Sequence, residues 1–131
     1  MRQMEQETKT VLIVEDDVFT AKYFEATIQR LGYETCGPAT TADEAVEIAR
    51  DRRPSMIFMD FRLRGVGDGA DAALEIYEFL QVPTVFVTGS DDPRSLERIR
   101  SDHPARIITK PVDTDQFRDV LSEFCPLAAD C

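Results

Sequence analysis

The sequence predicts a single α/β domain in which five parallel strands form one sheet between two layers of helices. Short apolar runs rich in β-branched residues recur along the 131 residues, and each is followed by a segment with helical periodicity. A chain of this length suits one compact domain. Because alternating strands and helices are joined by right-handed crossovers, we expect a three-layer sandwich.

The first two strand and helix units precede Pro54. The apolar run 11–14 is the first predicted strand, and Gly32 ends the helix that follows it. The apolar residues of this helix recur at helical spacing: Phe19, Tyr23, Phe24, Ile28 and Leu31. A shorter strand is expected at 35–37. Thr41 and Glu44 then stand at the spacing of a capping box, which predicts the start of the second helix.

The third unit contains the most apolar strand and a glycine-rich connection. The run 56–59 is continuously apolar, as expected for a strand buried on both faces. The segment 65–69 holds three glycines, which disfavour a helix, so we expect a loop there. The third helix is predicted over 72–80.

The last two units follow the same alternation. The fourth strand is predicted at 84–87, and Pro93 suits the first turn of the fourth helix. The fifth strand is predicted at 106–109. Asp113 and Gln116 stand at capping-box spacing before the last helix.

The overall composition narrows the function. We expect one domain over 10–124, end segments at 1–9 and 125–131, and no attached output domain. The absence of a long apolar run or secretory signal predicts a cytoplasmic protein without a membrane partner. The three cysteines show no paired spacing, and a net charge of −10 argues against nucleic-acid binding.

Polar residues follow four of the predicted strands where each strand ends. Glu15 and Asp16 follow the first strand, Asp60 the third, Thr88 the fourth and Lys110 the fifth. Ligands of open α/β sheets bind at this edge. Gathered carboxylates need a hard cation, and Mg²⁺ takes oxygen ligands. A carboxylate can accept a phosphoryl group, so Asp60 is the predicted nucleophile, with Lys110 and Thr88 holding phosphoryl oxygens.

The strings VLIVEDD, IFMDFRL, FVTG and TKP, in this order and spacing, resemble the receiver domains of response regulators over residues 10–124. The resemblance implies a flavodoxin-like fold with strand order 2-1-3-4-5 and a cis Lys110–Pro111 bond. It implies a Mg²⁺ site, possible also for Mn²⁺, whose ligands are Glu15, Asp16, Asp60 and the Arg62 backbone carbonyl. It implies these phosphoryl-site roles: Asp60 as acceptor, Thr88 as switch hydroxyl and Lys110 as phosphoryl-binding lysine.

The resemblance also implies a signalling role instead of that of a classical enzyme. A histidine kinase or histidine phosphotransfer protein would phosphorylate Asp60, and a further protein would read the result. The chain would be a monomer or a phosphorylation-dependent dimer. Output is expected on the face of the fourth helix, fifth strand and fifth helix. Relatives carry an aromatic residue where this chain has Ile107, so we expect segment 90–94 and the fourth helix to move instead.

Two other readings remain open at this point. A haloacid-dehalogenase-like phosphatase needs a second Asp two residues after the first, but Arg62 holds that position. A pseudo-receiver that only binds partners usually lacks one of the site residues, and here all are present. Among the remaining polar residues, Asp17 is interpreted as a helix start and His103 as an exposed, non-catalytic residue. Arg62 and Ser90 are expected to tune dephosphorylation.

Overall fold

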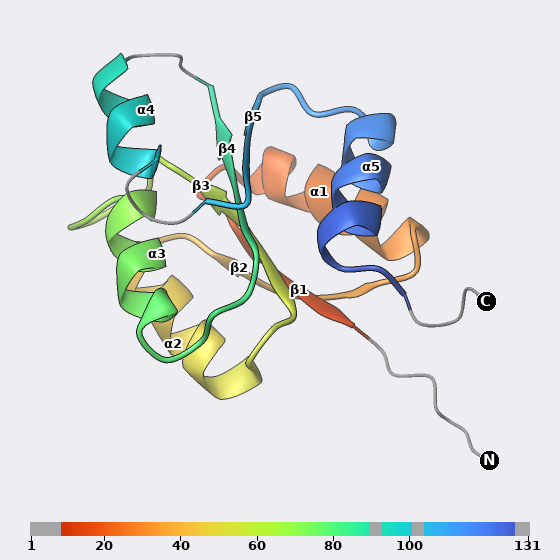
Figure 1. The fold of residues 1–131 in the computed structure, drawn as a ribbon, viewed down its shortest axis with the longest axis horizontal. Coiled ribbons are helices and arrows are strands. Elements are labelled where there is room, and N and C mark those ends of the chain that lie inside the picture. Colours follow the sequence, from red (N-terminus) through yellow and green to blue (C-terminus); the bar gives the residue numbers. More distant parts are fainter. Residues whose placement is uncertain (1–8, 90–92, 101–103, 128–131) are drawn as a thin grey trace.

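A five-stranded parallel sheet forms the middle of the molecule (Figure 1). The computed structural model describes residues 9–89, 93–100 and 104–127. The strands are β1 (Thr10–Val14), β2 (Glu34–Ala39), β3 (Met56–Asp60), β4 (Thr84–Thr88) and β5 (Arg106–Thr109). The helices are α1 (Val18–Arg30), α2 (Ala42–Arg52), α3 (Gly69–Tyr77), α4 (Pro93–Arg100) and α5 (Thr114–Phe124). The strand order is β2-β1-β3-β4-β5, which confirms the predicted fold class.

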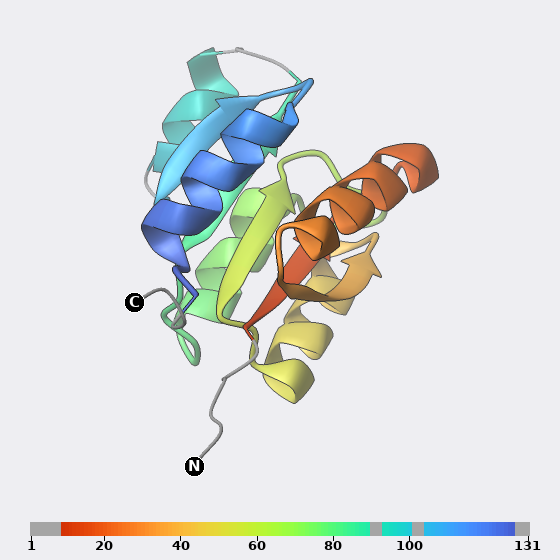
Figure 2. The same ribbon diagram turned by 90° about the vertical axis from the view of Figure 1, so that its right-hand side faces the viewer.

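The helices cover the sheet in two layers. Figures 1 and 2 show α1 and α5 on one face and α2, α3 and α4 on the other. Successive residues of a strand point to opposite faces, so each middle strand contributes to two cores. On β3, Phe58 packs toward α1 and α5, whereas Ile57 and Met59 pack toward α2 and α3. All three side chains are almost fully buried.

Side-chain caps begin the helices largely where the sequence predicts. Asp113 and Gln116 form the expected capping box at the start of α5. At α2, the Thr41 hydroxyl accepts a hydrogen bond from the Glu44 backbone N–H at 3.0 Å, as expected. The return bond differs, because the Glu44 carboxylate accepts from the backbone N–H of Thr40 at 2.8 Å and not from that of Thr41.

Helix α3 begins and ends three residues earlier than predicted. Asp68 and Asp71 form a capping box that starts the helix at Gly69, and its last residue is Tyr77. The expected loop over 65–69 is therefore wrong at its last residue. A good N-cap supplied by Asp68 outweighs the entropic cost of a glycine in the first turn.

The apolar stripe of α1 is only partly buried. Phe24 and Ile28 are 3% and 0% exposed, but Phe19 is 82% exposed and Tyr23 is 43% exposed. Helical periodicity grouped these residues on one face. The first turns of α1 extend past the sheet edge, however, so Phe19 lies on the surface. This leaves an apolar patch beside the carboxyl ends of the strands.

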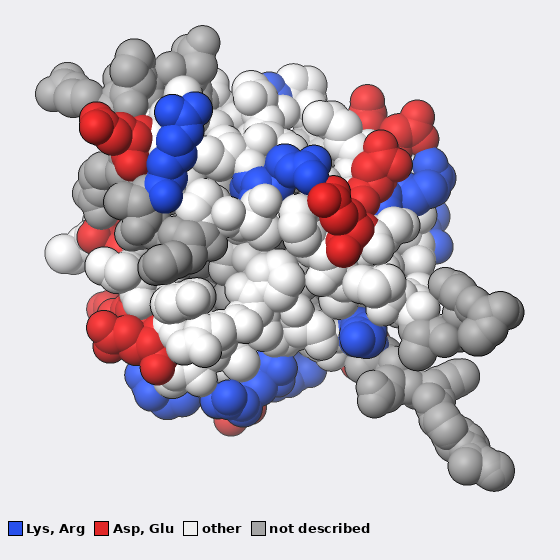
Figure 3. Space-filling model, viewed as in Figure 1, with Lys and Arg blue, Asp and Glu red and all other residues white. Residues whose placement is uncertain are grey.

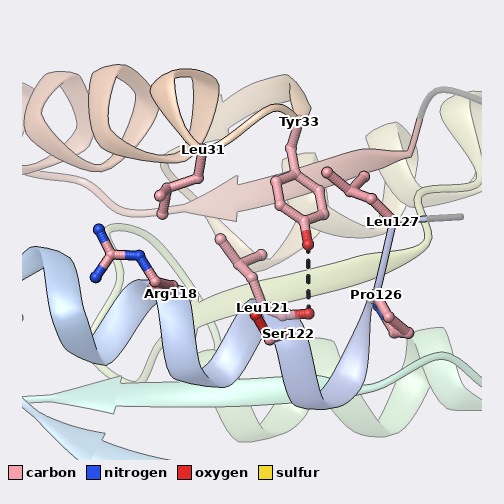
Figure 4. Close-up of a pocket in the computed structure, with 7 residues that line it drawn as sticks. All are labelled: Leu31, Tyr33, Arg118, Leu121, Ser122, Pro126 and Leu127. Atoms are coloured by element: carbon pink, nitrogen blue, oxygen red, sulfur yellow. Dashed lines mark hydrogen bonds between the residues drawn. The ribbon is translucent and has the colours of Figure 1, made fainter. Parts of the chain in front are cut away.

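The C-terminal end of α5 is tied back to the turn after α1. The hydroxyl of Tyr33 donates hydrogen bonds to the backbone carbonyls of Cys125 at 2.8 Å and Leu121 at 3.4 Å. Figure 4 shows the second of these bonds, with Leu31 and Leu127 on either side of the tyrosine ring. Cys125 is 3% exposed and Leu127 packs at the edge of the core. Packed structure thus continues past the end of α5.

The charged surface is divided into separate groups. Figure 3 shows basic side chains gathered at the lower edge, over α2, whose last turn carries Arg50 and Arg52. Helix α2 ends just before β3 begins, so this basic group lies at the amino ends of the strands. Among the described residues, no helix combines the length and apolar character needed to cross a membrane.

Candidate functional site: an acidic cleft at the carboxyl ends of the strands

A cleft of about 400 Å³ opens at the carboxyl ends of the strands. Its lining brings together each of the site residues that the sequence predicts. The lining residues are Glu15, Asp16, Asp17, Asp60, Arg62, Thr88, Gly89 and Lys110. Two other positions named from the sequence, Ser90 and His103, lie outside the described residues. Side chains from four strand ends therefore face one space.

Backbone pairing fixes the positions of these side chains. The N–H of Glu15 donates to the carbonyl of Ala39 at 2.8 Å, which extends the pairing of β1 and β2 by one residue. Asp60 is the last residue of β3 and pairs with Val87. The N–H of Lys110 donates to the carbonyl of Thr88 at 2.9 Å. The site is thus built on rigid strand ends instead of on long loops.

Three carboxylates of the cleft can share one cation. One oxygen each from Glu15, Asp16 and Asp60 lie within 4.8 Å of one another. Glu15 is 1% exposed and Asp60 6% exposed, so water alone cannot relieve their repulsion. An all-oxygen donor set is the type that Mg²⁺ prefers. These acids are able to hold such a metal.

Asp17 stands apart from this cluster, as its interpretation as a helix start requires. Its carboxylate accepts hydrogen bonds from the Thr20 backbone N–H at 2.8 Å and the Thr20 hydroxyl at 2.6 Å. These bonds lower the pKa of Asp17. Asp17 is the N-cap of α1, and its backbone N–H donates to Glu15 Oε2 at 3.0 Å. It therefore orients a member of the acidic cluster without joining it.

Lys110 is the cation that contacts both Glu15 and Asp60. Its Nζ lies 2.8 Å from Glu15 Oε1 and 3.3 Å from Asp60 Oδ2. Burial and the charge of Glu15 raise the pKa of Asp60 to about 7, although Lys110 opposes this rise. Burial disfavours the charged form of Lys110, but the carboxylates of Glu15 and Asp60 outweigh it and raise the lysine pKa. In the absence of a metal, the lysine offsets only part of the acidic charge.

The connection from β3 to α3 closes tightly behind Asp60. The N–H of Gly69 donates to the carbonyl of Phe61 at 2.7 Å, and a Cβ at Gly69 would collide with the Asp60 carbonyl oxygen. Arg64 in this loop reaches back toward Asp16, with 3.9 Å between Nε and Oδ2. Sequence reasoning missed both contacts. The Asp–Gly pair at 68–69 was the available signal for the first of them.

The peptide bond between Lys110 and Pro111 is cis, as expected. The bond between Gly37 and Pro38 is also cis, which the sequence did not indicate. Gly37 has φ of +95°, and a Cβ there would lie 2.6 Å from the Ile13 carbonyl oxygen. A glycine is therefore required where β2 passes β1 just before Glu15.

An apolar groove of about 560 Å³ adjoins the acidic cleft. Its lining includes Phe19 and Tyr23 of α1 and, after β5, Pro111 and Val112. Lys110 lies at the border of the groove and the cleft and lines both. A partner that rests in the groove would therefore approach Asp60.

Comparison with known proteins identifies the family. Residues 11–122 match the response regulator receiver domain. The chain is 34% identical over 114 residues to the phyllosphere-induced regulator PhyR of Methylorubrum extorquens. These aligned residues make up 86% of this chain. The match spans only 42% of PhyR. The polar-differentiation response regulator DivK of Brucella ovis is 31% identical over 124 residues, which cover 89% of this chain and 96% of DivK.

A solved receiver-domain structure shares the fold of this chain. The receiver domain of a sensor histidine kinase from Pseudomonas aeruginosa superposes with a TM-score of 0.80 at 25% identity, covering 90% of this chain and 98% of that one. That structure has a magnesium ion coordinated in its active-site cleft. From its strand order, its acidic cleft and the match over residues 11–122, this chain belongs to the response regulator receiver domain family.

Proposed function

We propose that this receiver accepts a phosphoryl group on Asp60 in a Mg²⁺-dependent reaction and thereby signals to another protein. The observation that supports this most directly is the convergence of three carboxylates and Lys110 at the end of β3. The donor is a histidine kinase or a histidine phosphotransfer protein of the cytoplasm. The receiver unit comprises residues 10–124.

The acidic cluster, Thr88 and Lys110 each have a role in this transfer. A carboxylate oxygen of Asp60 attacks phosphorus, the bond from phosphorus to the donor imidazole nitrogen breaks, and that nitrogen keeps the electron pair. The carboxylates of Glu15, Asp16 and Asp60 and the backbone carbonyl of Arg62 would hold the metal. When bound, Mg²⁺, or Mn²⁺ in its place, would supply positive charge toward the phosphoryl oxygens. Lys110 supplies a second positive charge and Thr88 a hydroxyl donor.

Exposed apolar residues beside the cleft support a protein donor. The groove between α1 and the segment after β5 borders Lys110, and Phe19 at its edge is 82% exposed. A large exposed aromatic side chain next to a reactive group favours a protein contact. We expect Phe19→Ala to slow transfer from a phosphotransfer protein while leaving transfer from acetyl phosphate unchanged.

Output uses the face formed by α4, β5 and α5, and a second copy of this chain can be the reader. Thr88 ends β4 and Lys110 follows β5, so phosphorylation draws on both strands that border this face. Ile107 is β-branched and half-buried, and it has few χ1 states to exchange. Movement of α4 and of segment 90–94 transmits the change. Positions 90–92 of that segment lie outside the described residues.

Acetyl phosphate labelling tests the acceptor and the metal together. Incubation with acetyl phosphate and Mg²⁺ should add one phosphoryl group, detected by intact-protein mass spectrometry, and Asp60→Asn should abolish it. Asp115→Asn is the matched control, because Asp115 is an exposed acid whose side chain is 84% accessible. Labelling of Asp60→Asn at the wild-type level, or labelling that persists with excess chelator, would refute the proposal.

A further inference from the structure

A hydrogen bond joins α1 to the backbone segment that carries Lys110. The hydroxyl of Tyr23 donates to the carbonyl of Val112 at 2.7 Å, between residues 89 positions apart in the sequence. Val112 is 2% exposed and comes two residues after Lys110. The contact is therefore long in sequence and close to the site, and the proposed transfer leaves it without a role.

The ring of Tyr23 is held in place by other aromatic residues. It meets Phe24 and Phe117 edge-on, with centroid separations of 6.1 Å and 6.2 Å. The ring centroid of Phe117 in turn lies 5.3 Å from that of Phe58, which is two residues before Asp60 on β3. These contacts fix the direction of the hydroxyl, since edge-to-face packing restrains a ring at such distances.

Lys110 lies between two backbone attachments. On one side its own N–H donates to Thr88, and on the other the Tyr23 hydroxyl holds the Val112 carbonyl. The Lys110 side chain is 27% exposed, and its Nζ reaches both buried carboxylates of the cleft. A long flexible side chain loses less entropy in such a contact when its backbone is fixed beforehand.

We propose that Tyr23 is a positioning residue for phosphoryl transfer, which acts by fixing the Lys110–Val112 segment so that the ammonium group of Lys110 faces Asp60. This inference rests on the proposed function of Asp60. Tyr23 itself does not touch the reacting atoms. Its hydroxyl orients Lys110 through the backbone, and a ring without the hydroxyl would still fill the same space.

The chain offers a matched control in Tyr33. Its hydroxyl also donates to a backbone carbonyl at 2.8 Å, that of Cys125, but at the amino ends of the strands, away from the cleft. Tyr23→Phe and Tyr33→Phe each remove one hydroxyl and keep one ring. If stability alone controlled the reaction, both variants would change the phosphorylation rate in parallel.

The experiment measures phosphorylation by acetyl phosphate with saturating Mg²⁺, because this small donor does not require the groove that Tyr23 lines. We expect Tyr23→Phe to react roughly three- to tenfold more slowly than wild type, the scale of one net hydrogen bond. Tyr33→Phe should react at the wild-type rate. Equal rates for Tyr23→Phe and wild type, or equal losses in both variants, would overturn the inference.

A double variant separates positioning from a general effect on the fold. If Tyr23 acts through Lys110, adding Tyr23→Phe to Lys110→Ala should cause no further loss of rate. A further loss of the full size would contradict this route. The amide NMR signals of Lys110 and Val112 should also shift in Tyr23→Phe. If the wild type were not labelled at all, the proposed function itself would be contradicted. Failure of the inference on Tyr23 is therefore distinguishable from failure of the proposed function.

Discussion

The middle strands of the sheet bury apolar side chains along most of their length and acidic side chains at their carboxyl ends. Through most of β3 the buried side chains are apolar, and Ile57, Phe58 and Met59 are each no more than 1% exposed. At its end the same strand buries Asp60, and β1 is followed by Glu15 with 1% exposure. A few residues therefore separate apolar side chains, whose burial stabilises the folded state, from acidic side chains, whose burial destabilises it.

This difference shows how a receiver can keep a reactive carboxylate on a stable fold. Buried apolar side chains stabilise the folded state by about 1.5–3 kcal/mol each. Buried acids without enough positive charge oppose folding. The apolar stretch must offset that cost in the absence of a metal. Perturbing either side of this balance should change the free energy of unfolding, most strongly on the apolar side.

The apolar side should respond most strongly to Phe117→Ala. Phe117 is fully buried and contacts the rings of Phe24 and Phe58. We expect the free energy of unfolding in urea to fall by about 3–5 kcal/mol, since truncation leaves a cavity. Leu74→Ala, at a 50% exposed position of α3, is the control and should cost far less. Equal losses would remove the distinction between core and surface.

The acidic side should make the metal-free protein less stable as pH rises. The pKa of Asp60 is raised from 3.8 in the unfolded chain to about 7 in the folded protein. Between these values the folded protein holds a proton that the unfolded chain has released, so the free energy of unfolding falls with rising pH. We expect a fall of about 2–4 kcal/mol between pH 4 and pH 7.5 in chelator.

The variant Asp60→Asn sharpens this pH test. It should lose most of the slope and exceed the wild-type stability at pH 7.5 without metal. Asp115→Asn should keep the slope. A stability of the wild type that rises steadily from pH 4 to pH 7 in chelator would show that the acids are balanced without a cation.

The junction of the two regions should be sensitive to Gly69→Ala. A methyl group there collides with the Asp60 carbonyl, so β3 or the start of α3 must shift. Overpacking of this kind costs about 1–3 kcal/mol. We also expect weaker Mg²⁺ binding, measured by titration calorimetry. Gly89→Ala is the stability control, because nothing lies within 4 Å of a Cβ at that position. Equal unfolding free energies in both variants would contradict the close approach.

Strain remote from the cleft should be removable without affecting the metal. Arg53 ends α2 with φ of +44°, a left-handed conformation that favours glycine. Arg53→Gly should raise the free energy of unfolding by up to about 1 kcal/mol. Because Arg53 lies at the amino ends of the strands, Mg²⁺ affinity should not change. Arg52→Gly, inside the helix, should destabilise instead. A change in Mg²⁺ affinity in Arg53→Gly would couple the two ends of the sheet.

The alternation of strands and helices could be predicted from the sequence because β3 and its neighbours are nearly all apolar. The residues of the cleft could also be predicted, since strand ends collect at one edge of a parallel sheet. The start of α3 could not, because a cap at Asp68 competes with the preference of glycines for loops. The exposure of Phe19 could not be predicted either. Periodicity shows which residues share a helix face, but not how far the helix extends beyond its sheet.

Contacts between distant segments were the least accessible to sequence reasoning. In the sequence, Tyr23 is only one more residue of an apolar helical stripe, and nothing indicates that its hydroxyl forms a hydrogen bond. Nothing in the sequence around Val112 indicates an acceptor. The pKa of Asp60 likewise depends on how deeply Glu15 is buried beside it. Such quantities follow from three-dimensional packing and not from local patterns.

The two ends of the packed chain leave the molecule on the side away from Asp60. Strand β1 starts at Thr10, and the segment tied down by Tyr33 runs to Leu127, both at the amino ends of the parallel strands (Figure 1). Coupling the protein to a sensor surface through either end would therefore leave the acidic cleft turned toward the solution. Immobilised kinase-binding measurements are thus possible with a tag at either end.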